Sequence, residues 1–151
     1  MMIVKVILLV IMMILSQSMD KDIFYVKKYK DYKQVLLKPR LEISGYGILS
    51  KPLERKEIGI VFEEKFNDSI VIYLNDIEKY RAKIKTSRIG VCANQFFLKR
   101  EHFSDKVSIL FVDMNLNIEF KVNGFFAMCY INRLWGEINV VLSNHYRVYK
   151  S

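Results

Sequence analysis

The chain from Glu57 onward alternates between apolar and polar residues with a period of two, and this pattern restricts the fold more than any other feature. Successive side chains of a β-strand point to opposite faces, so the alternation predicts strands with one dry face and one solvated face. Turn-forming residues interrupt the pattern every eight to twelve positions, which is typical of sandwiches and barrels. We therefore expect an all-β, mainly antiparallel fold.

The apolar positions also predict which side chains face the interior. Alternation in 80–85 predicts a half-solvated strand, and Asn67-Asp68-Ser69 and Asn75-Asp76 are expected to be turns. Asn123-Gly124 predicts a type I′ hairpin turn. The expected inward sets are Ile58, Ile60 and Phe62; Ile70, Ile72 and Leu74; Val107, Ile109 and Phe111; Ile118, Phe120 and Val122; and Ile138, Val140 and Leu142.

The return strand after that turn, 125–131, is apolar on both faces, so we expect it at the centre of a sheet that is covered on both sides. About seven or eight strands result, which favours a β-sandwich. A flattened β-barrel is the alternative closure, because sequence does not separate the two.

The first residues have the layout of a signal peptide. Lys5 precedes an apolar run from Val6 to Leu15, and Ser16 and Ser18 follow at a small-x-small spacing. This run has about half of the roughly 20 apolar residues that a spanning helix needs. We expect cleavage after Ser18, export to the periplasm or the extracellular space, and no transmembrane segment after cleavage. A lipid anchor is not expected, because no cysteine lies at the cleavage point.

Three segments follow: a signal peptide (1–18), a basic N-terminal arm (19–56) that is part of the domain or packs on it, and a sandwich core (57–151). The arm contains 10 basic and 5 acidic residues, whereas the core contains 13 and 11. Residues 22–37 fit two structures. Their tyrosines recur at helical spacing, but Ile23 to Val26 is good strand material, so a short amphipathic helix and an edge strand with an extended arm remain open.

Lysine and tyrosine alternate in the arm in a way that suits polyanions, because ammonium groups neutralise phosphate or sulfate while rings pack on apolar surface. A solvated basic face is the simpler interpretation. The candidate polyanion-binding residues are Lys27, Lys28, Tyr29, Lys30, Tyr32, Lys33, Lys38 and Arg40.

Aromatic residues near the C-terminus form a second candidate surface for a carbohydrate or a protein. Trp135, Tyr146 and Tyr149 are the candidates, and Trp135 beside Gly136 in a predicted turn is the one most expected to be exposed. Core packing is the alternative explanation for such rings.

The two cysteines, Cys92 and Cys129, leave two interpretations. An exported protein meets an oxidising compartment, which favours a disulfide between them, but both fall in apolar strand sequence, where free thiols pack as small apolar residues. Neither lies in a nucleophile motif, and Cys and His are too scattered for structural zinc. Asp113 to Asn117 is expected to be a turn rather than a calcium loop. No catalytic residue, metal or cofactor is predicted.

These features predict an exported, non-enzymatic β-sandwich that binds a protein or an anionic glycan or lipid, with no specific nucleic-acid partner. Two alternatives belong to other classes. One is a small exported hydrolase that uses dispersed acidic residues in a deep pocket. The other is a subunit of an envelope assembly that pairs with its neighbour by strand addition. The oligomeric state and the identity of the ligand stay open.

Overall fold

The computed structural model describes residues 2–19, 24, 26–27, 31–43, 56–63, 66–85 and 94–144. Among these residues, helix α1 (Met2–Met19) comes first and ten strands follow. The side chains of residues 2–11 are exposed, so this part of the helix is not packed against a core. Within the described part of the chain, no helix combines the length and the apolar character that crossing a membrane requires.

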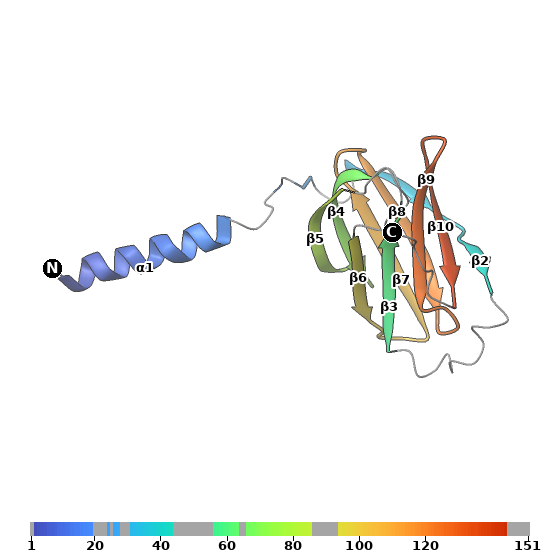
Figure 1. The fold of residues 1–151 in the computed structure, drawn as a ribbon, viewed down its shortest axis with the longest axis horizontal. Helices are drawn as coiled ribbons and strands as arrows, with labels where there is room; N and C mark the ends of the chain where they lie inside the picture. Colours follow the sequence, from blue (N-terminus) through green and yellow to red (C-terminus); the bar gives the residue numbers. More distant parts are fainter. Residues whose placement is uncertain are drawn as a thin grey trace, which may run out of the picture.

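The ten strands form two five-stranded sheets that face each other (Figure 1). The first sheet has the order β1-β8-β7-β4-β5, with bounds β1 (Lys33–Leu36), β8 (Leu116–Asn123), β7 (Ser104–Phe111), β4 (Asn67–Leu74) and β5 (Ile77–Lys85). The second has the order β2-β10-β9-β3-β6, with bounds β2 (Arg40–Glu42), β10 (Glu137–Ser143), β9 (Met128–Leu134), β3 (Glu57–Phe62) and β6 (Asn94–Lys99).

Each sheet ends in its own edge strands, so the described strands form a sandwich and not a closed barrel. Most neighbours are antiparallel, as expected, and three pairs are parallel: β1 with β8, β2 with β10 and β3 with β9. Consecutive strands β1 and β2 belong to different sheets. The chain therefore crosses from one sheet to the other over residues 37–39, along one side of the sandwich.

The predicted inward sets are confirmed. All of them lie in one buried cluster between the sheets, together with Phe66, Ile84 and Cys129. The strand expected at 125–131 is found as β9, which begins at Met128. Its expected central place is confirmed, because β9 is the middle strand of its sheet and Met128 to Ile131 are buried on both faces. On the outer face of β9, Tyr130 and Met128 join a second buried cluster with Val61 and Val141.

The N-terminal arm forms two strands, β1 and β2, that the strand prediction from residue 57 onward did not include. Lys33–Leu36 forms β1, an edge strand, so these four residues are not helical. The strand expected at Ile23 to Val26 falls partly outside the described residues and stays a prediction. Immediately before it, Tyr32 is buried against Val71 and Leu110 on the outer face of the first sheet, and Phe24 and Val26 pack on the same cluster. Segment 31–43 is thus integrated with the domain, and residues 20–23, 25, 28–30 and 44–55 lie outside the described part.

Two turn predictions are wrong. Asn67, Asp68 and Ser69 belong to β4, and Asp68 and Ser69 are buried. Asn123-Gly124 does not close a hairpin, because β8 and β9 belong to different sheets. Instead, Asn123 accepts hydrogen bonds from the next loop: its carbonyl from Phe126 N (3.2 Å) and its Oδ1 from Phe125 N (3.0 Å). The backbone φ of Asn123 is not positive, unlike that of a type I′ turn residue. Its two hydrogen bonds stabilise the turn through which the chain crosses to the other sheet.

Positive φ angles occur instead in other turns of the described chain: at Asn115 (51°) between β7 and β8, and at the two hairpins with two-residue turns. Asn75 (48°) and Asp76 (68°) join β4 to β5, which confirms the turn predicted there. Trp135 (54°) and Gly136 (77°) join β9 to β10. Strand β5 is solvated more fully than its alternation predicts: it is the edge of its sheet, and Ile84 is its one fully buried residue.

Candidate binding groove

A groove of ≈ 340 Å³ lies where the crossing segment 37–39 meets the β9–β10 hairpin. The parallel pairing of β2 with β10 sets Arg40 opposite Val141, which fixes the register of the crossing segment. We call this site the crossover groove. It is lined by Leu37, Lys38, Arg40, Asn132, Leu134, Ile138, Asn139, Val140 and Val141.

Strand alternation assigns much of the groove to the outer face of the second sheet. Ile138, Val140 and Leu142 face the core, so Asn139 and Val141 between them face outward. Residues directly opposite in an antiparallel pair share a face, which places Asn132 on the outer face with its partner Asn139. Two amide side chains therefore meet two basic ones over an apolar floor.

The charge of the groove comes from the arm. Lys38 and Arg40 are both exposed, and neither forms an ion pair with a described residue. Among the described residues that line the groove, none carries a carboxylate. Two neighbouring cations without an acidic neighbour in the lining favour an anionic ligand group, and a guanidinium offers the planar pair of donors that suits carboxylate, sulfate and phosphate.

The β9–β10 hairpin extends beyond its sheet next to this groove. Pairing of β9 with β3 ends at Ile131, so Asn132 to Leu134 pair with β10 alone. Figure 1 shows this hairpin projecting past the neighbouring strands. At its tip Trp135 is 94% exposed, as the sequence predicted, and Leu134 beside it is exposed and lines the groove.

Of the remaining basic candidates, Lys27 and Lys33 are described by the structure and do not line the groove. Lys27 Nζ lies 5.8 Å from the centroid of the Tyr32 ring and 3.4 Å from Asn115 Oδ1, and the Tyr32 hydroxyl accepts a hydrogen bond from Lys27 N. Tyr32 is buried, so its ring is a packing element and not a face open to a ligand. Lys33 is exposed at the start of β1. Lys28, Tyr29, Lys30, Tyr146 and Tyr149 lie outside the described residues.

Cys129 is a free, fully buried cysteine in the core of the sandwich. Burial raises the pKa of its thiol, and the nearby Arg100 opposes this shift only in part. A thiol in such a position is a poor nucleophile. Cys129 forms no disulfide in this structure, so the free-thiol interpretation applies to it and the predicted pairing is not present. Cys92 itself lies outside the described residues.

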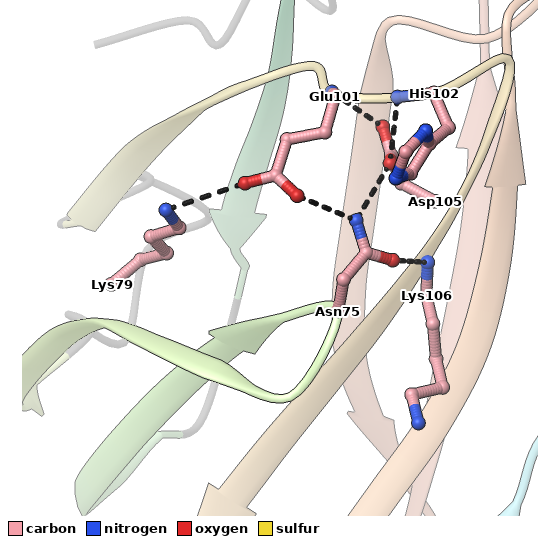
Figure 2. Close-up of polar contacts among 6 residues, drawn as sticks. All are labelled: Asn75, Lys79, Glu101, His102, Asp105 and Lys106. Atoms are coloured by element: carbon pink, nitrogen blue, oxygen red, sulfur yellow. Dashed lines mark hydrogen bonds and ion pairs between the residues drawn. The ribbon is translucent and has the colours of Figure 1, made fainter.

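A polar cluster joins the β4–β5 turn to the β6–β7 loop and the start of β7 (Figure 2). Its centre is Asp105, which is fully buried and accepts hydrogen bonds from Asn75 Nδ2 (2.9 Å), His102 N (3.0 Å) and Glu101 N (3.2 Å). Glu101 in turn accepts from Asn75 Nδ2 (3.0 Å) and pairs with Lys79 (3.5 Å). The bond from Asn75 holds the pKa of the Glu101 carboxyl below its ordinary value, and Lys79 acts in the same direction.

The hydrogen bonds of this cluster hold the β6–β7 loop against the β4–β5 turn. Every oxygen of Asp105 faces a donor from its own loop or from the β4–β5 turn. Buried polar groups that are satisfied in this way stabilise one arrangement of the backbone. No group of three or more His, Cys, Asp or Glu residues that could hold a metal occurs among the described residues.

Asp68 is the other buried carboxyl in the described part of the chain. Burial raises its pKa above 3.8 and the neighbouring Asp113 acts in the same direction, whereas a hydrogen bond from Asn67 N and the charge of Arg133 oppose the shift. Asp68 does not line the crossover groove. The groove and the perturbed carboxyl are therefore separate features.

Sequence reasoning identified Lys38, Arg40 and Trp135 but missed the amides that complete the groove. The sequence indicates only weakly that Asn132 and Asn139 face outward: each is a polar residue next to an apolar residue that faces the core. Their meeting depends on the β9–β10 register, which the sequence alone does not give. Comparisons with models of known families, with curated proteins and with solved structures find no match to this chain. The functional argument consequently depends on the groove itself.

Proposed function

We propose that this protein is an exported, non-enzymatic β-sandwich module that binds polyanions through the crossover groove. One observation carries the proposal: Lys38 and Arg40, which the sequence singled out within a basic arm, line a groove of ≈ 340 Å³ together with two amide side chains. That volume lies within the range of natural ligand sites, which is about 300–1,000 Å³. The net charge of +8 supports attraction of anionic partners at a distance.

Retention on a heparin column across a salt gradient tests the binding. The full chain is expected to be retained at low salt and released as salt rises, because exposed charges are screened over about 10 Å at 0.1 M salt. The double variant Lys38→Gln/Arg40→Gln is expected to elute at clearly lower salt than the wild type.

A matched control separates groove binding from net charge. Lys83→Gln/Lys85→Gln removes the same two charges from exposed positions on β5, at the opposite edge of the sandwich. Its elution is expected to shift much less. Equal shifts in both double variants would mean that the column responds to overall charge and would reject the groove as the binding site.

Export requires its own test. The proposed cleavage after Ser18 predicts that the protein purified from its natural source begins near Met19. N-terminal sequencing and intact mass measure this directly, and a native protein that retains residues 1–18 would contradict export through a cleaved leader.

A further inference from the structure

The conformation of Trp135 is the observation that goes furthest beyond polyanion binding. Trp135 has a positive φ of 54° at a two-residue hairpin turn and is 94% exposed. Positive φ is uncommon for residues other than glycine and is unfavourable for bulky ones, whereas asparagine adopts it readily in this type of turn. The fold therefore gains nothing from tryptophan at this position, neither in packing nor in backbone conformation.

The hairpin carries Trp135 beside the groove. Leu134 precedes it and lines the groove, and the pair Leu134–Glu137 closes the turn. Between tip and floor, Asn132 and Asn139 lie directly opposite each other on the outer face. From tip to base, the surface thus offers an aromatic ring, the exposed carboxylate of Glu137, two amides and two cations.

We infer that the crossover groove binds an acidic saccharide. This inference rests on the proposed function and names its ligand class. Sugars with a carboxylate or sulfate group combine the three chemistries of the site: an apolar ring face for Trp135, hydroxyls for the amides of Asn132 and Asn139, and a negative charge for Lys38 and Arg40.

A naked polyanion or a lipid surface matches the site less well. Polyphosphate has no apolar face for Trp135. Binding to a flat anionic membrane would use neither a groove nor two opposed amides on the outer face of a sheet. Both are therefore outcomes that the experiment distinguishes from acidic saccharide binding.

The test uses three probes with the full chain: an oligogalacturonate, a polyphosphate of similar charge and anionic phospholipid vesicles. Trp135 is the only tryptophan, so its fluorescence reports contact at the hairpin tip. Oligogalacturonate is expected to change this fluorescence and to saturate. Polyphosphate is expected to bind more weakly and to leave the fluorescence unchanged.

Two variants separate recognition from folding. Trp135→Asn is expected to weaken oligogalacturonate binding about tenfold, as measured by calorimetry, because aromatic stacking contributes on the order of 1–3 kcal/mol. Its thermal midpoint is expected to be equal or higher, since asparagine suits the turn. Phe125→Asn is the control, because Phe125 is an exposed aromatic residue in the β8–β9 loop, at the other end of β9, and its affinity is expected to match the wild type.

Each possible result bears on either the saccharide inference or the proposed function. Undiminished oligogalacturonate binding by Trp135→Asn, or polyphosphate binding equal to that of oligogalacturonate, would overturn the saccharide inference and leave polyanion binding intact. Trp135-dependent binding to vesicles without oligogalacturonate binding would overturn it in favour of a lipid surface. Binding of all probes that is unaffected by Lys38→Gln/Arg40→Gln would overturn the proposed function itself.

Discussion

Asn75 and Asp105 connect the β4–β5 turn to the start of β7 through a hydrogen bond of 2.9 Å between Asn75 Nδ2 and Asp105 Oδ1. Asn75 Oδ1 accepts a bond from Lys106 N (2.9 Å), and Asn75 N donates to Lys106 O (2.8 Å). With Asn75 in the left-handed backbone conformation, its side-chain amide donates to Asp105 and accepts from Lys106, both at the start of β7. Figure 2 shows this hydrogen-bonded polar junction between the β4–β5 turn and the start of β7.

Truncation of Asp105 is expected to be strongly destabilising. Asp105→Ala leaves two loop N–H groups without their acceptor and removes one of the two hydrogen bonds that Asn75 Nδ2 donates, so we expect a loss of about 3 kcal/mol in the free energy of unfolding. Asp105→Asn keeps one acceptor oxygen and is expected to lose less. Urea denaturation of the two variants and the wild type measures the difference, and wild-type stability in Asp105→Ala would show that the junction contributes little.

Asp68 is expected to make stability depend on pH. Its pKa is raised in the folded state, so the folded protein binds the proton more tightly than the unfolded chain. The contribution of Asp68 to the free energy of unfolding therefore decreases as pH rises above about 3.8, and it stays lower at neutral pH than at low pH. We expect Asp68→Asn to raise the melting temperature at pH 7 and to have a smaller effect at pH 3. A larger gain at pH 3 than at pH 7 would contradict the assigned direction.

Cys129 is expected to resist alkylation in the folded protein. Its complete burial and raised pKa leave little thiolate and no access for a reagent. Iodoacetamide at pH 8, followed by peptide mass spectrometry, should modify Cys129 slowly in buffer and rapidly in urea. Similar rates in the two conditions would mean that the core around β9 opens readily.

Gly136 is expected to tolerate asparagine better than alanine. Its φ is +77° and nothing lies within 4 Å of an added Cβ, so backbone conformation alone decides the effect of a substitution. Gly136→Ala is expected to lose about 1 kcal/mol of stability and Gly136→Asn less, because asparagine adopts positive φ more readily. Thermal unfolding of the two variants measures this order, and equal losses would contradict it.

Gly124 shows why the strongest turn signal in the sequence failed. The dipeptide Asn123-Gly124 has the residues of a type I′ turn, yet an added Cβ on Gly124 would lie 2.8 Å from the ring of Phe103. The glycine leaves room for Phe103, which packs edge-on against Phe125 at 5.5 Å between centroids. Arg100 fastens the same crossover by donating to the carbonyls of Asn123 and Phe126. Contacts from a distant loop therefore determined the path of the chain after β8.

The sequence by itself determined which side chains enter the core, because burial imposes a two-residue period on any half-buried strand and leaves that period in the chain. It also determined that a tryptophan in a tight turn is exposed. Only the tertiary structure decided that β1 and β2 pair in parallel with β8 and β10, and that Lys38 and Arg40 meet Asn132 and Asn139. Strand order and register depend on contacts between residues far apart in the chain, and local periodicity contains no information about these contacts.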